Sequence, residues 1–462
     1  MLFTSYIFYL LLLALLLALR YTRLPRVALV NAAGLVFYGA WNPAYCLLLV
    51  FVILTAHYSA RLLAGGSRRG LLAVSLGALL LPLLFFKYQE FLLGVIGDLA
   101  SLWGPRPAFS ALEVVLPVGI SFYSFQALSY VVDVYRGELA PCRRLSQFFL
   151  YISFFPQLIA GPIERAGHIL PQVERLARRQ RLPVDLLPAC DLFLRGLVKK
   201  AVFADSFARY VDLVFTRLDE VSFPCILAAT GFFTLQIYCD FSGYTDMARG
   251  LARAMGVELS INFDYPYLAR NIAQFWRRWH VTLSTWFRDY VYIPLGGSRR
   301  GEARTYLNLM LTMLLCGLWH GAAYTFVIWG AYHGLLLAVH RFYALRLARR
   351  LPLPRLLCGA LTLGAVSLGW FVFRARELSD LVLFVHRALD WREGLRLGAA
   401  TSQWFLALVF VAWQGLEALW WKRRWSLVEL AGWRRAAFAC AVGLFLFLFK
   451  PASDVVFIYF QF

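Results

Sequence analysis

A histidine lies in the middle of an apolar stretch of this chain. His320 belongs to residues 306–339, a run that contains no Asp, Glu, Lys or Arg. Ionisable side chains inside such runs are rare and usually functional. A neutral imidazole donates a hydrogen bond from one ring nitrogen, accepts one at the other and titrates near neutral pH, which suits a general base beside lipid. We therefore take His320 as the leading catalytic candidate; a histidine that only packs helices together is the alternative.

The length of this run predicts a break next to His320. Its 34 residues, at about 1.5 Å per helical residue, exceed one membrane crossing of roughly 30 Å. Gly321 is the natural position for the chain to turn. Hydrocarbon cannot satisfy the backbone groups that a break releases, so we expect this point to be buried in protein or to line a cavity. We also expect His320 to be reachable from both sides of the membrane.

A second histidine lies in a basic and aromatic segment. The motif Trp-Arg-Arg-Trp-His occupies residues 276–280, and its aromatic residues continue at spacings of three and four. This spacing predicts one helix with an aromatic face, lying at the cytoplasmic interface or in the mouth of the bundle. A plain interfacial anchor is the alternative. The predicted aromatic face consists of Trp276, Trp279, His280, Leu283 and Trp286 or Phe287, and the arginines outside it are Arg277, Arg278 and Arg288.

A third group of polar residues ends the apolar block at 226–239. Asp240, Ser242 and Asp246 follow it within seven positions. A carboxylate at membrane depth requires a partner, which an arginine or histidine of the aromatic segment would supply. For Asp240 we expect a buried structural role or one that orients a histidine. For Asp246 the alternative, a polar loop that caps the next helix, is favoured.

Composition places the chain among polytopic membrane proteins. It is 61% hydrophobic and only 16% charged, against about 25% charged residues in a soluble domain. Apolar blocks recur from residue 4 to residue 449 without a long polar interruption, so we predict one integral-membrane domain over residues 1–462. The predicted fold class is all-α, with roughly ten or more transmembrane helices together with re-entrant and interfacial helices.

The positive charge of the chain indicates orientation rather than nucleic-acid binding. The net charge is +20, but the arginines are dispersed in loops beside apolar blocks, where the positive-inside rule and anionic lipids account for them. Arg20, Arg23 and Arg26 follow the first apolar run, which predicts an external N-terminus and a retained first span. The eight cysteines form no close pairs, so we expect neither a disulfide framework nor a metal site.

Several motifs in collinear order resemble the membrane-bound O-acyltransferase superfamily, and within it the alginate O-acetyltransferase branch. The most specific are Trp-Arg-Arg-Trp-His at 276–280 and Trp-His-Gly at 319–321. The others are Leu-Pro-Val-Gly-Ile-Ser-Phe-Tyr-Ser-Phe-Gln at 116–126, Gly-Pro-Ile-Glu-Arg at 161–165, Tyr-Cys-Asp-Phe-Ser-Gly-Tyr-Thr-Asp-Met-Ala at 238–248, Pro-Leu-Gly-Gly at 294–297 and the terminal Phe-Ile-Tyr-Phe-Gln-Phe at 457–462.

This resemblance implies acyl transfer across the membrane through a funnel or tunnel. The family histidine that matches His320 lies where a cytoplasmic opening meets one from the far side, and the histidine matching His280 has a supporting role. The expected donor is acetyl-CoA or another acyl thioester, with no bound cofactor. We expect Trp276, Arg278, Trp279, Asp240, Ser242 and Trp319 to line the donor tunnel.

The resemblance also implies a setting and partners. The protein would lie in the bacterial inner membrane and act on an exopolysaccharide similar to alginate or cellulose. It would act directly or through a periplasmic acetyltransferase of the SGNH hydrolase type, beside a polysaccharide synthase. D-alanyl transfer from a carrier protein to a cell-wall polymer is the alternative within the family. A transporter, a lipid-linked glycan flippase and a structural subunit of a synthase complex are the alternatives outside it.

Overall fold

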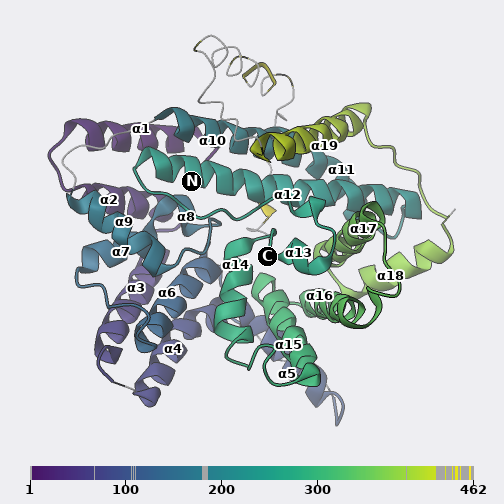
Figure 1. Cartoon of the computed structure of the whole chain (residues 1–462), viewed down its shortest axis with the longest axis horizontal. Coiled ribbons are helices and arrows are strands. Elements are labelled where there is room, and N and C mark those ends of the chain that lie inside the picture. The colour runs from purple at the N-terminus through teal and green to yellow at the C-terminus, as the bar shows by residue number, and fades with distance from the viewer. Residues whose placement is uncertain are drawn as a thin grey trace. The chain divides into compact units, whose positions relative to one another are not determined.

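The computed structural model is helical, as Figure 1 shows. It describes residues 3–66, 68–105, 107, 109, 111–178, 186–391, 393–422, 432, 440, 443–445, 448 and 457–458. Within these residues the extended pairing is a single isolated bridge between Val221 and Leu395. The predicted all-α class is confirmed. The apolar block at 436–449 and the last four residues of the terminal motif lie largely or wholly outside the described residues.

The chain divides into two compact units. The first contains Met1–Phe193 and Met247–Ser260, and the second contains Leu194–Asp246 and Ile261–Phe462. The chain passes from one unit to the other within helix α10 (Leu186–Val198) and again within α12 (Phe223–Ala254). A single functional domain over residues 1–462 stays a prediction.

The first unit contains most of the helices of the N-terminal half. They are α1 (Tyr6–Tyr21), α2 (Arg26–Gly39), α3 (Ala44–Leu63), α4 (Arg69–Leu83), the π-helix η1 (Leu84–Tyr88), α5 (Gln89–Ala100), α6 (Ile120–Tyr135), α7 (Leu145–Ser153), α8 (Phe155–Leu158) and α9 (Ala166–Arg178).

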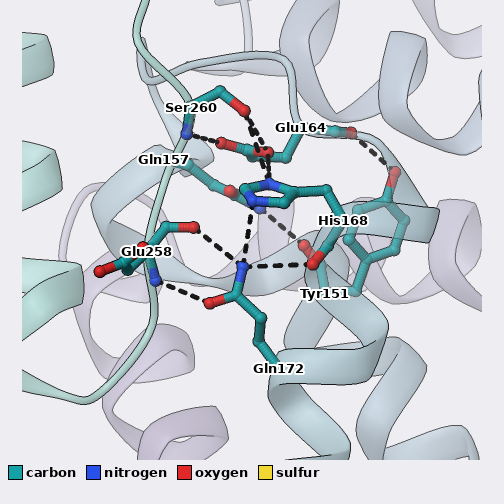
Figure 2. A network of polar contacts seen from close by, with 7 residues as sticks. All are labelled: Tyr151, Gln157, Glu164, His168, Gln172, Glu258 and Ser260. Atoms are coloured by element: carbon teal, nitrogen blue, oxygen red, sulfur yellow. Dashed lines mark hydrogen bonds and ion pairs between the residues drawn. The ribbon is translucent and has the colours of Figure 1, made fainter.

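A partly buried network of polar side chains lies in this unit (Figure 2). Glu164 lies two residues before α9. Its carboxylate accepts hydrogen bonds from the backbone N–H of Ser260 and from the Ser260 hydroxyl, the latter at 3.0 Å. Its other neighbour is His168 Nδ1 at 2.8 Å, and this contact raises the pKa of the half-exposed imidazole. Gln172 exchanges two hydrogen bonds with the backbone of Glu258, at 2.8 and 3.0 Å. Glu164, just before α9, and Gln172 within it therefore bind the extended segment that follows α12.

The second unit contains the candidate catalytic residues. Its helices are the π-helix η2 (Lys199–Ala204), α11 (Asp205–Phe215), most of α12, the 3-10 helix η3 (Pro266–Leu268), α13 (Ile272–Trp276), α14 (Val281–Phe287), the π-helix η4 (Arg288–Tyr292), α15 (Glu302–His320), α16 (Tyr324–Phe342), the π-helix η5 (Tyr343–Leu347), α17 (Arg355–Arg374), α18 (Leu378–Leu389) and α19 (Thr401–Lys422).

Several helices of both units suit a lipid bilayer. Among the described residues, four helical stretches combine the length and hydropathy of a membrane span: Ala44–Leu63, Arg69–Ala100, Phe223–Ala254 and Arg355–Arg374. Two shorter helices, Tyr6–Tyr21 and Arg26–Gly39, are also apolar. The polytopic membrane character is therefore confirmed, while the number of crossings stays a prediction.

Helix α12 differs from the sequence expectation. We expected the apolar block at 226–239 to end before Asp240, yet α12 runs through it and has 32 residues in all, from Phe223 to Ala254. Asp246 lies inside this helix rather than at its N-cap, and its carboxylate pairs with Lys199 Nζ at 2.8 Å. The cap interpretation is therefore wrong. Because its charge is compensated, the carboxylate can remain in the helix interior.

Candidate active site

His320 is the last residue of α15. The chain leaves the helix at Gly321, which is fully extended, and α16 begins at Tyr324. The predicted break is confirmed. A Cβ at position 321 would overlap the ring of Phe326, so the close approach of the two helices explains the glycine. Only 5% of His320 is exposed, as expected for a helix end that hydrocarbon cannot solvate.

Aromatic rings surround the His320 imidazole. Its centroid lies 4.9 Å from Trp319, 5.1 Å from Trp329 and 5.3 Å from Phe373, and all three contacts are edge-to-face. These rings come from α15, α16 and α17, so three helices enclose one imidazole. These rings and the burial of His320 shield the imidazole from solvent, as suits a general base that must accept a proton within a closed site.

His280 lies in the turn between α13 and α14. Its backbone adopts the left-handed conformation, with φ 42° and ψ 55°, which is uncommon for a residue other than glycine. The segment is therefore not the single amphipathic helix that we predicted. Its aromatic face is nevertheless buried: Trp276, Trp279 and Leu283 are inaccessible, while Arg277 is exposed.

Asn262 explains why the helix breaks at His280. The Asn262 carbonyl groups replace helical acceptors: Val281 N–H donates to the backbone oxygen at 3.0 Å, and Thr282 N–H donates to Oδ1 at 3.2 Å. A backbone N–H can only donate, so Oδ1 is an acceptor, and His280 Nδ1, 3.1 Å away, is the donor toward it. Complete burial lowers the pKa of His280 to about 3. The ring is therefore neutral, with its lone pair on Nε2.

Trp319 connects the two histidines. Its ring lies 5.9 Å from the His280 ring and 4.9 Å from the His320 ring, with edge-to-face geometry in both contacts. The structure thus brings together three residues that the sequence singled out, from the end of α15 and from the turn before α14.

Asp240 has a different partner from the one we expected. Its carboxylate lies 2.8 Å from Lys200 Nζ, in the π-helix η2, rather than near an arginine or histidine of the aromatic segment. Lys200 also binds Asp205 at 2.7 Å. The backbone N–H of Ile458 donates to Asp240 at 2.7 Å, and Phe457 packs 5.1 Å from Tyr244. Asp240 therefore holds the terminal motif to α12, while the next ring, Phe241, lies 4.7 Å from His280.

A cavity of about 480 Å³ adjoins these residues. Residues of α13, α14, η4, α15 and α16 line it, and the lining is mostly apolar. Trp276 and Cys316 belong to the lining, and Cys316 lies one helical turn before His320. Two exposed arginines, Arg277 and Arg288, also contribute. Of the six residues expected in the donor tunnel, Trp276 lines this cavity.

The other five occupy separate positions. Trp279 is buried and its ring lies 4.7 Å from Trp370. Arg278 accepts through its carbonyl oxygen from Asp264 N–H at 3.0 Å. Ser242 is buried in α12, two residues after Asp240. Trp319 lies between the histidines, as described above, and the membership of these residues in a donor tunnel stays a prediction.

The sequence interpretation missed four residues of this region. Adjacent lysines at 199 and 200, between apolar residues, are a signal of buried ion pairs that we did not use. His333 lies in the same uncharged run as His320 and is fully buried. Asn262 gave no local signal, because its role depends on an element that follows it by eighteen residues.

Comparison with known proteins identifies the family. The family model of membrane-bound O-acyltransferases matches residues 143–357. A probable alginate O-acetylase from Pseudomonas aeruginosa is 39% identical over 385 residues, which cover 82% of this chain and 73% of that protein. A peptidoglycan O-acetyltransferase from Helicobacter pylori is 37% identical over 77% of this chain and 72% of its own length.

A third relative belongs to a different activity within the family. The teichoic acid D-alanyltransferase of Bacillus subtilis is 25% identical over 59% of this chain and 72% of its own length. The match to the O-acetylase extends over most of both chains. The region matched by the family model contains both histidine motifs. The chain therefore belongs to the membrane-bound O-acyltransferase family and is an O-acyltransferase.

Proposed function

We propose that this protein transfers an acetyl group from a cytoplasmic acetyl thioester to a hydroxyl group of an extracytoplasmic polysaccharide. The observation that carries the proposal is the burial of His320 at the break between α15 and α16. The relatives named as O-acetylases share more identity with this chain than the D-alanyltransferase does, which favours acetyl over D-alanyl as the acyl group.

The cavity beside α14 is the proposed donor site, and acetyl-CoA is the proposed donor. The apolar walls of the cavity suit the carrier arm of acetyl-CoA. Arg277 and Arg288 suit the phosphate groups at the far end of that arm. Cys316 in the lining and His320 lie one turn apart on α15. A thioester in this cavity would therefore extend toward the imidazole.

His320 acts as the general base in the proposed reaction. The neutral imidazole takes the proton of the acceptor hydroxyl while the hydroxyl oxygen attacks the thioester carbonyl. The tetrahedral intermediate then collapses, the C–S bond breaks, and the thiol leaves with a proton returned from the imidazolium. A positioned base contributes about 10² to 10⁴ in rate. His280 supports the reaction by holding Trp319 beside His320.

The proposed setting is the bacterial inner membrane, with the N-terminus outside. Arginines at residues 299, 300 and 304 precede α15, and the positive-inside rule assigns that end to the cytoplasm. The acceptor then arrives from the opposite side. A periplasmic acetyltransferase and a polysaccharide synthase are the proposed partners.

Thiol release by the purified protein tests the proposal. We expect wild-type protein in liposomes to release free thiol from acetyl-CoA when the acceptor fraction is present, and His320→Gln to lower the rate by about 10² or more. His57→Gln is the matched control, because His57 is equally buried but lies in α3 of the other unit. It should retain wild-type turnover.

Two results would contradict the proposal. Wild-type polysaccharide acetylation by His320→Gln would remove the assigned base. Turnover of a D-alanyl carrier-protein thioester without turnover of acetyl-CoA would replace the donor.

A further inference from the structure

Four buried aromatic side chains of the second unit carry nitrogen atoms without a hydrogen-bond partner within the described part of the chain. They are the indole nitrogens of Trp276, Trp329 and Trp370 and both ring nitrogens of His333. We call these four residues the indole–imidazole cluster. Their side chains come from α13, α16 and α17.

The members of the cluster are in mutual contact. The His333 ring lies 4.7 Å from Trp329, 5.2 Å from Trp276 and 6.5 Å from Trp370. Gly369 leaves the space that His333 occupies, because a Cβ there would lie 2.8 Å from His333 Nε2. The unsatisfied nitrogens are therefore concentrated in one place.

Such a concentration is energetically unusual. A buried donor or acceptor without a partner destabilises the folded state, whereas apolar groups of the same shape avoid this cost. Buried polar groups in folded proteins nearly always find a partner, so the exceptions indicate a ligand, water or a functional role. Phenylalanine at position 333 would fill the same space without this penalty.

The cluster borders the proposed donor cavity and the proposed base. Trp276 belongs both to the cluster and to the cavity lining, and Leu337, one turn after His333 on α16, also lines the cavity. On the other side, Trp329 lies 5.1 Å from His320. A polar group delivered through the cavity would therefore reach unsatisfied donors immediately before it reaches the base.

We propose that the indole–imidazole cluster recognises the secondary amides of the donor's carrier arm, and that His333 is a specificity-determining residue. The proposal rests on the proposed function above. Indole nitrogens only donate, so they suit an amide carbonyl oxygen. Neutral His333 also has an accepting nitrogen, and it alone in the cluster can receive an amide N–H. Because His333 is fully enclosed, donor binding includes a rotation of the Trp276 indole.

A comparison of thioesters with and without amides tests this proposal. Acetyl-CoA and S-acetylpantetheine contain the amides, whereas an acetyl thioester of a simple alkyl thiol does not. For His333→Phe we expect KM to rise about tenfold for the amide-containing donors, the equivalent of one lost hydrogen bond. KM for the simple thioester should stay at the wild-type value. The thermal midpoint should equal or exceed that of wild type, because unsatisfied polar atoms are removed.

Two further variants separate recognition from packing. His333→Gln keeps one donor and one acceptor, and we expect it to restore much of the preference for amide-containing donors. Tyr332→Phe is the matched control on the same helix, since it removes only the hydrogen bond from the Tyr332 hydroxyl to the Ala365 carbonyl. Any change that it makes to KM should be the same for both classes of donor.

The outcomes distinguish this proposal from the proposed function. Suppose that wild type turns over both classes of donor, and that His333→Phe changes KM equally for both or for neither. This result would overturn the cluster assignment alone. Loss of folding in His333→Phe would assign the residue to helix packing and would also overturn it. If wild type releases thiol from neither class, the proposed function fails, and this assignment fails with it.

Discussion

Lys200, near the candidate site, forms ion pairs with two carboxylates. It binds Asp205 and Asp240 at 2.7 and 2.8 Å, and all three side chains are buried. Removal of one partner from a buried ion pair leaves an uncompensated charge, which costs more than the pair itself contributes. The two ends of this network are therefore not equivalent.

This asymmetry predicts different effects for the two substitutions. Lys200→Met strands two carboxylates and should destabilise the protein by about 3–5 kcal/mol. Asp240→Asn should cost less, because Lys200 keeps Asp205, and the double variant should be less destabilised than the sum of the single variants. Denaturant titration in detergent measures the three values. Additive losses would show that Lys200 and Asp240 do not interact energetically.

At the scale of elements, Glu164 before α9 and Gln172 within it bind the extended segment after α12, and we call these two residues the clamp. Glu164 and Gln172 bind alternate residues of that segment, Ser260 and Glu258, as Figure 2 shows. Two residues further along the chain, Asn262 orients His280. Side-chain hydrogen bonds therefore fix the position of the extended segment, first at Glu258 and Ser260 and then at Asn262. No pairing with a β-strand is needed for this.

Truncation of the clamp should destabilise the protein without any change to the histidines. Glu164→Ala removes the acceptor of the partly buried Ser260 N–H, and we expect a loss of about 1–3 kcal/mol. Glu174→Ala, within α9, is the control: its exposed pair with Arg178 contributes at most about 1 kcal/mol. Unfolding in detergent measures both. Equal losses of unfolding free energy in the two variants would show that Glu164 does not stabilise the extended segment.

At the scale of the whole molecule, the arginine distribution and the helix order together predict sidedness. Arginines at 299, 300 and 304 precede α15, so the turn at Ser298 should face the cytoplasm. The α15–α16 pair returns the chain to that side. The apolar helix α17 then crosses, which assigns Ser379, at the start of α18, to the outside.

Cysteine labelling tests this topology. In a background without the eight native cysteines, an impermeant thiol reagent added from outside should modify Ser379→Cys and leave Ser298→Cys unmodified until the membrane is opened. Both positions are exposed, so access rather than burial decides the result. External modification of Ser298→Cys would reverse the orientation and the proposed side of donor entry.

The sequence by itself determined that this is a helical membrane protein and made His320 the leading catalytic candidate. Apolar composition indicates a membrane protein, and long uninterrupted apolar runs favour helices, which satisfy their own backbone hydrogen bonds. The uncharged run of 34 residues requires a break, and Gly321 beside His320 marks it. Both conclusions depend on local composition and on length, which are one-dimensional quantities.

Only the tertiary structure decided which polar residues meet. Asp240 faces Lys200 rather than an aromatic-segment arginine, because α12 continues through the polar residues and η2 brings the lysine to them. The helical spacing around His280 failed as a predictor because Asn262, eighteen residues earlier, supplies hydrogen bonds that compete with the helix. Hydrogen bonds between residues far apart in the sequence outweigh local periodicity at such points, and these points are where the candidate site lies.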